Sequence, residues 1–256
     1  MKFAIFNRIN EENNQITNSL SSLCERNGFV LDNDHPDIVF VIGGDGTFLR
    51  AVHQYMDQLD SVKFIGIRSG SLGFYYDFSK DELPELVEMI KNNQMVKNEH
   101  HLIECELNGK IIYAVNEIRF ENPFHTLVCK VKINGEELET FHGNGLLVCN
   151  ELGSTAYNKS LGGAVISQRL SLLQLTEIAT IQNNAYRSLG SSLILNNSSI
   201  CSFEGNFHKT VIGYDHLTCD SNQSDVINIS SSKKTIAILR RKDYSNIEIL
   251  KRSFVK

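Results

Sequence analysis

The chain has 256 residues, of which 41% are hydrophobic and 21% are charged, and its formal net charge is −5. This length suits one large domain or two modest ones, and the composition is that of a globular protein. The negative charge gives no electrostatic support for a nucleic-acid partner. No apolar run is long enough to span a bilayer, and the six cysteines are scattered without a Cys-x-x-Cys pair. We therefore expect a cytoplasmic protein with reduced thiols, without a zinc site or a disulfide framework.

Residues 1–99 show apolar patterns typical of strands that alternate with helices. The expected strands are Lys2–Phe6, Phe29–Leu31, Asp37–Ile42 and Val62–Ile67, and the expected helices are Glu11–Asn27, one that begins near Thr47, and Asp81–Asn92. This alternation indicates a parallel sheet covered on both faces, whose ligands lie at the carboxyl ends of the strands. We therefore predict a Rossmann-like α/β domain over residues 1–99.

From about His100 onward the pattern changes to short strands with hairpin signals. Asn108-Gly109 and Asn134-Gly135 each stand between two apolar runs, as in tight hairpin turns. The expected strands are Leu102–Leu107, Ile111–Val115, Leu127–Ile133, Glu137–Phe141, Leu146–Cys149, Ser192–Leu195, Ile200–Phe203, Thr210–Ile212, Val226–Ile229 and Thr235–Leu239, while Leu170–Ile181 fits either period. Residues 100–239 are expected to form an all-β domain of sandwich or barrel size, and we predict a β-sandwich. The tail 240–256 has weak helical spacing and is expected to return to the first domain.

Gly43–Thr47 joins a buried strand to a helix and carries an unexpected carboxylate. Glycines in such a turn can take positive φ and let a phosphate approach the backbone, and the helix N-terminus offers free N–H groups. Asp45 would repel a phosphate, but a phosphotransfer enzyme needs an acceptor for the proton of its hydroxyl nucleophile. Asp45 could equally be the N-cap of the helix, a role that aspartate fills well. The spacing alone leaves both interpretations open.

A second polar stretch, Gly153–Gly163, follows the apolar strand Leu146–Cys149. Its hydroxyl and amide groups can hydrogen-bond a ribose or an adenine edge, and Tyr157 can stack on a base. A polar loop closed by a serine or threonine turn explains the same residues. From the residues alone, the polar loop is the simpler interpretation.

Together these stretches resemble the motifs of NAD kinases. Gly43–Thr47 resembles a signature that NAD kinases share with diacylglycerol and sphingoid-lipid kinases and, more loosely, with phosphofructokinases. The other matches follow in the family's order: Gly70–Phe74 resembles its Gly-x-Leu-Gly-Phe loop, Asn116-Glu117 its Asn-acid pair, Gly143–Gly145 its Gly-Asp-Gly, and Gly153–Tyr157 its second signature. Lipid kinases do not share this set, so the chain is most similar to a compact bacterial NAD kinase.

The resemblance implies transfer of a phosphoryl group from ATP, or from another donor such as polyphosphate, to the 2′-hydroxyl of the adenosine ribose of NAD. It implies that Asp45 is the general base, that Gly44 and Gly46 let phosphates approach, and that magnesium arrives with ATP. The other implied ligand residues are Phe74, Asn116, Glu117, His142, Asn144, Thr155, Ala156, Tyr157, Asn158, Ser160 and His216, with Ala179 and Tyr186 contributed by a neighbouring subunit of a homotetramer. No residue is implied as a metal ligand.

The chain departs from the family pattern at several positions. Asn144 replaces the acid of Gly-Asp-Gly, His142 stands where arginine is common, and Glu151-Leu152 replaces a threonine- and proline-containing lead into Gly153. These departures leave a second interpretation open, a catalytically weak paralogue that binds a dinucleotide, and a third is a lipid kinase. Because an amide bonds a donor less strongly than a carboxylate does, we also expect Asn144→Asp to tighten NAD binding.

Overall fold

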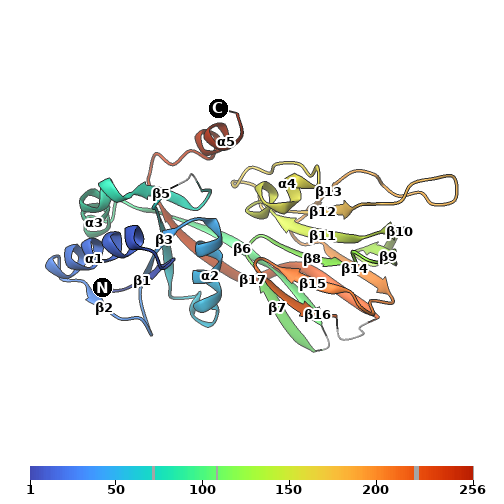
Figure 1. The fold of residues 1–256 in the computed structure, drawn as a ribbon, viewed down its shortest axis with the longest axis horizontal. Helices are drawn as coiled ribbons and strands as arrows, with labels where there is room; N and C mark the ends of the chain where they lie inside the picture. Colours follow the sequence, from blue (N-terminus) through green and yellow to red (C-terminus); the bar gives the residue numbers. More distant parts are fainter. Residues whose placement is uncertain (71–72, 108, 222–224, 256) are drawn as a thin grey trace. The chain divides into compact units, whose positions relative to one another are not determined.

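The computed structural model describes residues 1–70, 73–107, 109–221 and 225–255. The chain forms two units, one from Met1–His100 with Lys234–Lys256 and the other from His101–Lys233 (Figure 1). The first is an α/β domain that includes the C-terminal residues, and the second is a β-sandwich, so the predicted fold class is confirmed. Among the described residues, no helix is long and apolar enough to cross a membrane. All six cysteines are free thiols, and five of them are buried.

The first unit is built on a parallel sheet in the order β2-β1-β3-β4, with β5 and the end of β17 both paired to β4. Its strands are β1 (Lys2–Asn7), β2 (Val30–Leu31), β3 (Ile38–Gly43), β4 (Lys63–Arg68), β5 (Tyr76–Ser79) and the last residues of β17 (Val226–Arg240). Its helices are α1 (Glu11–Arg26), α2 (Asp45–Gln54), α3 (Leu83–Lys91) and α5 (Asn246–Phe254), with short 3-10 helices at Met56–Gln58 and Lys80–Glu82. The predicted parallel sheet is confirmed.

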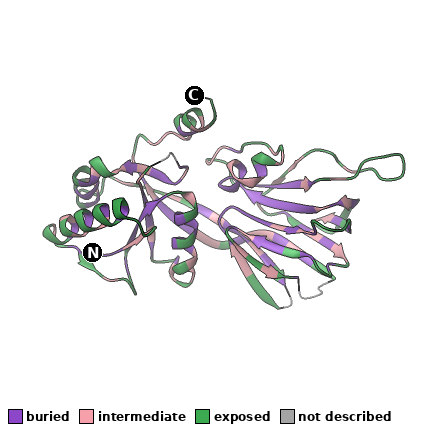
Figure 2. Cartoon of the chain, viewed as in Figure 1, coloured by how far each residue is buried: buried purple, intermediate pink, exposed green. Residues whose placement is uncertain are grey.

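Different helices cover the two faces of this sheet (Figure 1). Every residue of β3 is buried, as a continuous apolar run predicts for a central parallel strand (Figure 2). Its alternate residues Ile38, Phe40 and Ile42 pack in one cluster with residues of α1 and α3. On the opposite face lies α2, whose Phe48 stacks on the Tyr75 ring with centroids 4.3 Å apart. The packing of α2 therefore fixes the position of Gly43–Thr47, which joins β3 to α2 and includes the first residues of α2.

The second unit packs two antiparallel sheets. One has the order β10-β9-β14-β17 with β6 and β7 alongside, and the other has the order β13-β12-β11-β8-β15-β16. The strands are β6 (Val96–Leu107), β7 (Lys110–Ala114), β8 (Glu117–Glu121), β9 (Leu127–Ile133), β10 (Glu136–Gly143), β11 (Gly145–Asn150), β12 (Leu172–Ile178), β13 (Leu193–Asn196), β14 (Ile200–Gly205), β15 (Val211–Tyr214) and β16 (Leu217–Asp220). A 3-10 helix, Gly153–Thr155, and the short helix α4 (Tyr157–Ser160) follow β11.

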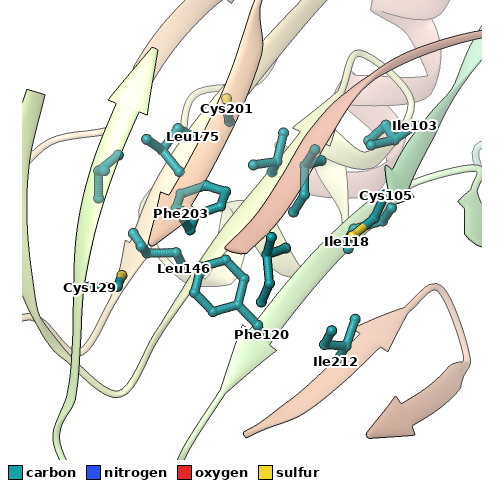
Figure 3. Packing of buried hydrophobic residues seen from close by; sticks show 14 of the residues in the cluster. Ile103, Cys105, Ile118, Phe120, Cys129, Leu146, Leu175, Cys201, Phe203 and Ile212 are labelled. Atoms are coloured by element: carbon teal, nitrogen blue, oxygen red, sulfur yellow. The ribbon is translucent and has the colours of Figure 1, made fainter. Parts of the chain in front are cut away.

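Side chains from both sheets form the sandwich core (Figure 3). Phe120 of β8 and Phe203 of β14 approach with ring centroids 4.7 Å apart, and Phe207 meets the same Phe120 ring edge-on at 5.4 Å. Leu146 of β11 and Cys129 of β9 belong to the same cluster. Because successive residues of a strand face opposite ways, every second residue of these strands enters this core.

Some predicted elements differ from the structure. The runs Val226–Ile229 and Thr235–Leu239, predicted as two strands, belong to one strand, β17. The ambiguous stretch Leu170–Ile181 contains the strand β12. The strands β5, β8 and β16 were not expected, and Glu117 is the first residue of β8.

The hairpin prediction at Asn134-Gly135 is confirmed. Asn134 and Gly135 have φ of 52° and 86°, the left-handed conformations that a tight two-residue hairpin turn requires. In the other predicted hairpin, Gly109 has φ 74°, while Asn108 lies outside the described residues.

Candidate functional site

Asp45 is the first residue of α2, and its carboxylate bonds the loop that precedes β5. The carboxylate oxygens accept hydrogen bonds from the backbone N–H of Phe74 at 2.9 and 3.2 Å and from that of Tyr75 at 3.4 Å. The N-cap position of α2 belongs to Gly44. The helix-cap interpretation of Asp45 is therefore wrong, because its carboxylate reaches across to another loop.

The surroundings of Asp45 act on its pKa in opposite directions. Burial raises the pKa of Asp45, while the N–H groups of Phe74 and Tyr75 and the charge of Arg240 oppose that rise. The Tyr76 hydroxyl donates a hydrogen bond to the carbonyl oxygen of Gly44 at 2.6 Å and so ties β5 to the turn. Asp45 is thus a half-buried carboxylate in a turn that is held in place, with a raised pKa suited to taking up a proton.

The glycines of the turn have separate roles. Gly43 has φ +154°, and a Cβ there would lie 2.6 Å from the Thr47 hydroxyl oxygen. Gly44 has φ −118°, so Gly43 and not Gly44 is the positive-φ glycine of this turn. A Cβ at Gly44 or Gly46 would meet nothing within 4 Å. Both residues are exposed, so the start of α2 is open to solvent at Gly44 and Gly46.

Gly73 gives the Asp45 carboxylate its room. A Cβ at Gly73 would lie 2.6 Å from Asp45 Oδ1, which is closer than two such atoms can approach. The sequence resemblance included Gly73 in the Gly70–Phe74 loop but gave no reason for it. Ser71 and Leu72 of the same loop lie outside the described residues. The Phe74 side chain packs against Phe254 of α5, with ring centroids 5.5 Å apart.

In the second unit, Asp215 fixes the turn that leads into β8. Its carboxylate accepts hydrogen bonds from the backbone N–H of Val115 at 2.8 Å and of Asn116 at 2.7 Å. Its own N–H donates to the carbonyl oxygen of Glu117 at 3.2 Å. Sequence reasoning did not select Asp215 as a site residue, although it stands beside the selected His216. His216 is exposed in the turn between β15 and β16.

Glu117 is a buried acid, only 5% exposed. Burial and the charge of Asp215 raise the pKa of Glu117 to about 8, against the effect of Arg119. The Arg119 guanidinium lies 3.7 Å from Glu117 Oε1 but bonds Glu121 more closely, at 2.8 Å. Among the described residues, none donates a hydrogen bond to Glu117 Oε2. This oxygen is a buried polar atom without a donor from the described residues, and a neutral carboxyl can both donate and accept a hydrogen bond.

The Gly153–Gly163 stretch holds its side chains in different ways. Thr155, Ala156 and Tyr157 are half-buried, and Ser160 is exposed. The Tyr157 ring packs on the small cluster of Leu147, Cys149 and Ile178. The Arg119 guanidinium carbon lies 5.4 Å from the centre of the Tyr157 ring, so Arg119 links this ring to Glu117.

Asn158 is a structural residue of this stretch. It is fully buried, and its amide N–H groups donate to the carbonyl oxygens of Ser154 at 3.1 Å and Ala164 at 3.2 Å. Its amide oxygen accepts the Thr176 hydroxyl at 2.7 Å. The prediction that Asn158 binds the ligand is not retained, because its donors and its acceptor already serve the chain.

Asn144 is likewise bonded within the chain. Its amide N–H donates to the carbonyl oxygen of Asn122 at 3.0 Å, and its own carbonyl oxygen accepts the Asn122 N–H at 2.7 Å. An aspartate at this position could not make the first bond. Asn144 therefore joins two backbone segments, and its role as a ligand residue stays a prediction.

The segment 179–192 follows β12 and contains Ala179 and Tyr186. It lies beside His142 near the end of β10, because the Ile181 N–H donates to the His142 carbonyl oxygen. The His142 ring stacks on the Tyr186 ring with centroids 4.1 Å apart. Ala179 has φ +46°, which is uncommon for a residue with a side chain, and lines a cavity of about 500 Å³. Tyr186 is 43% exposed.

Two family models match most of the chain. The ATP-NAD kinase N-terminal domain matches residues 6–95, and the ATP-NAD kinase C-terminal domain matches residues 116–241. The chain belongs to the NAD kinase family. Within the family, it is 37% identical to the NAD kinase of Lysinibacillus sphaericus (strain C3-41), over 100% of this chain and 99% of that protein.

Other NAD kinases agree in sequence and in fold. The NAD kinase of Leuconostoc citreum (strain KM20) is 41% identical over 76% of each chain. The crystal structure of an NAD kinase from Archaeoglobus fulgidus in complex with ATP has a TM-score of 0.79 at 18% identity, and the match covers 98% of this chain and 95% of that one. At that identity the likeness concerns the fold alone.

For a member of the NAD kinase family, the structure brings the expected residues together in two groups. In the first unit, Gly44, Asp45 and Gly46 share the turn that Phe74 bonds through its backbone. In the second, Asn116, Glu117 and Tyr157 are linked through Asp215 and Arg119. Asp215 stands directly before His216, which the resemblance selected, whereas Arg119 had no signal in the sequence.

Proposed function

We propose that this member of the NAD kinase family transfers the γ-phosphoryl group of ATP to the 2′-hydroxyl of the adenosine ribose of NAD. The family assignment over both domains, with a held carboxylate at Asp45, is the observation that carries the proposal. The bond between the 2′-oxygen and the γ-phosphorus forms, and the bond between that phosphorus and the β-bridging oxygen breaks. The products are NADP and ADP, and the hydroxyl proton passes to Asp45.

Asp45 is suited to that proton transfer. Because burial raises the pKa of Asp45, its carboxylate is a stronger base than an exposed aspartate. The N–H groups of Phe74 and Tyr75 fix the direction of the carboxylate. A base that is already oriented needs no reorganisation when the hydroxyl attacks.

Phosphate groups are proposed to approach at Gly44 and Gly46. Both glycines have open space where a Cβ would stand, and they flank the first residue of α2. The free N–H groups and partial positive charge of a helix N-terminus favour an anion there. Phosphate oxygens can therefore approach the backbone beside Asp45 even though its carboxylate repels them.

The dinucleotide is proposed to bind residues of the second unit. Asn116 and Glu117 are proposed to bond ribose and the nicotinamide side, and the buried Glu117 carboxyl oxygen that no described residue bonds supports this. Tyr157, half-buried beside Arg119, offers a ring face to the adenine. The remaining proposed ligand residues are Thr155, Ala156, Ser160, His142 and His216 of the second unit and, in the first unit, Phe74.

Magnesium is proposed to accompany ATP. In the ranges that the structure describes, no three His, Cys, Asp or Glu side chains gather to hold a metal, so these residues do not form a metal cage. Magnesium is commonly held mainly by substrate phosphates, where it neutralises the charge of the transferred group. The chain's own residues carry the proton transfer.

A homo-oligomer, a tetramer with two-fold axes, is proposed from the exposed residues of the 179–192 segment. Tyr186 stacks on His142 and still exposes 43% of its surface, and Ala179 lines an open cavity, so both could meet a neighbouring subunit. Light scattering that finds a fully active monomer would contradict this.

The cytoplasm is proposed as the location of the protein because the cysteines are free thiols, five of them buried as small apolar residues.

The experiment that tests the function is product analysis with the purified chain. NAD, ATP and magnesium are supplied, and the product is measured with an NADP-dependent dehydrogenase, with polyphosphate in a parallel reaction. NADP formed in proportion to enzyme supports the proposal. Saturable NAD binding without NADP would instead make the chain a binding paralogue. Phosphorylation of diacylglycerol in place of NAD would make it a lipid kinase, which neither the family models nor the curated relatives favour.

A further inference from the structure

We infer that Arg240 is a positioning residue for Asp45, acting through the peptide group between Phe74 and Tyr75. The inference rests on the proposed function, because it concerns the residue that would take the proton. Neither the sequence motifs nor the resemblance selected Arg240. It stands at the end of β17, far along the chain from the turn that it serves.

Arg240 is a buried arginine with two polar contacts. It is 1% exposed, its Nη1 lies 2.6 Å from Asp77 Oδ1, and its Nη2 donates to the Phe74 carbonyl oxygen at 3.0 Å. The guanidinium carbon also lies 4.3 Å from the centre of the Tyr244 ring. A charge so deeply buried is costly unless it is paired, so this arrangement is built by the fold and is not a chance surface contact.

The peptide group couples Arg240 to Asp45 directly. The Phe74 carbonyl and the Tyr75 N–H belong to one planar unit and point in opposite directions. Arg240 holds the carbonyl end, while the Tyr75 N–H points at Asp45 Oδ1 at 3.4 Å. The neighbouring Phe74 N–H donates to the same carboxylate at 2.9 Å. Loss of the guanidinium would therefore free the peptide that orients the carboxylate.

Arg240 also acts on Asp45 by its charge. Burial raises the pKa of Asp45, and the Arg240 charge is among the effects that lower it. The other titratable groups here are Asp77, Tyr244 and Tyr76; Asp77 pairs with Arg240, and the Tyr76 hydroxyl bonds the Gly44 carbonyl. Removing the guanidinium leaves the Asp77 charge without this partner, so both changes raise the pKa of Asp45.

Arg241 provides a matched control. It is the next residue, its guanidinium pairs with Glu82 at 2.7 Å and Glu85 at 2.9 Å, and it lies 4.3 Å from the Phe78 ring centre. Its environment thus contains the same kinds of groups as that of Arg240. Its side-chain bonds go to the start of α3 and the preceding 3-10 helix, and not to the Asp45 turn.

The test compares wild type with Arg240→Met, Arg240→Lys and Arg241→Met. For each protein, kcat and the KM for NAD are measured as a function of pH. Arg240→Met is expected to lower kcat at least tenfold, to move the acid limb of the profile up by about one pH unit, and to leave KM within about threefold. Arg240→Lys keeps the charge but not the two-pronged contact, so its kcat falls while its acid limb moves less. Arg241→Met should keep both the kcat and the profile of wild type.

A measurement without substrate separates this inference from the proposed function. The Asp45 carboxyl carbon is labelled, assigned by its loss in Asp45→Asn, and titrated by NMR in wild type and in the Arg240 variants. A higher titration midpoint in Arg240→Met supports the inference even where no NADP is formed. An unchanged midpoint in Arg240→Met would overturn it, whether or not the protein is an active kinase. If Arg240→Met does not fold, Arg240→Lys decides: wild-type kcat in that variant overturns the inference.

Discussion

Asn144 donates a side-chain hydrogen bond to the backbone carbonyl of Asn122 at 3.0 Å, and this contact reverses the expected effect of a mutation. From the sequence, Asn144→Asp should have tightened NAD binding. In the structure, an aspartate would place a carboxylate against a carbonyl oxygen, with no proton to share.

We therefore predict that Asn144→Asp destabilises the protein by about 1–3 kcal/mol, because an acceptor loses its donor and meets a charge. Urea denaturation at neutral pH measures this. Asn196→Asp is the matched control: Asn196 is exposed and uses its amide oxygen as an acceptor from Ser198, which an aspartate can replace. A stability equal to wild type in Asn144→Asp, or tighter NAD binding, would return Asn144 to the ligand residues.

The raised pKa of Glu117 predicts a stability that falls as the pH rises. The folded protein holds this proton up to a pKa of about 8, whereas the unfolded chain releases it near the usual value for glutamate. Between those values the unfolded state binds fewer protons, so stability decreases with pH by up to about 1.4 kcal/mol per unit. Glu117→Gln cannot ionise, so denaturation curves from about pH 5 to about pH 8 should depend less on pH than those of wild type. Identical slopes for the two proteins would show that Glu117 is not protonated in the folded state.

Gly73 should be required for activity. The Cβ of Gly73→Ala would lie 2.6 Å from Asp45 Oδ1 and 2.7 Å from the Tyr76 ring, so the substitution should shift the carboxylate together with the ring beside it. Misplacing a catalytic group by about 1 Å can lower kcat about 10²-fold. Gly70→Ala in the same loop is the control, because a Cβ there meets nothing within 4 Å. Equal kcat values for the two variants would mean that the position of the carboxylate does not limit the reaction.

Tyr157 should contribute to dinucleotide binding. Tyr157→Ala is predicted to weaken NAD binding about two- to twelvefold, the value of one aromatic contact, and Tyr157→Phe to have a smaller effect. Calorimetric titration with NAD measures both variants, and thermal unfolding measures the packing lost from the Leu147, Cys149 and Ile178 cluster. A loss of stability with unchanged NAD affinity would make Tyr157 a core residue.

The sequence predicted those parts of the fold that neighbouring residues determine, such as a buried strand or a tight turn. The run Ile38–Gly43 is apolar throughout because both faces of β3 are covered, and this reads directly from the sequence. The Asn134-Gly135 turn needs two positive φ angles, which these residue types favour. The strand β8 was missed although charged residues alternate with its buried Ile118 and Phe120, which is itself a strand pattern.

The sequence predicted only those residues of the candidate site that stand within a recognisable motif. Asp45 stands out because a carboxylate is unusual in a glycine turn, but the partner that orients it lies 29 residues away. Asp215 acts on Asn116 across 99 residues, and Arg240 acts on Phe74 across 166. Spacing along the chain gives no access to such contacts, since the topology of the fold brings them together. Asn158 shows the reverse case, because a residue within a motif can also serve the scaffold.

The proposed reaction depends most on Asp45 as the general base, and Asp45→Asn tests this role most directly. The asparagine keeps an oxygen that can accept the Phe74 N–H, so the turn is retained while the base is removed. The measurement is NADP formation from NAD and ATP at neutral pH by wild type and variant, with NAD affinity measured in parallel. We predict that kcat falls by about 10²–10⁴ while NAD affinity stays within a few-fold. A variant that keeps most of the wild-type kcat would contradict the account, since the proton would then pass elsewhere.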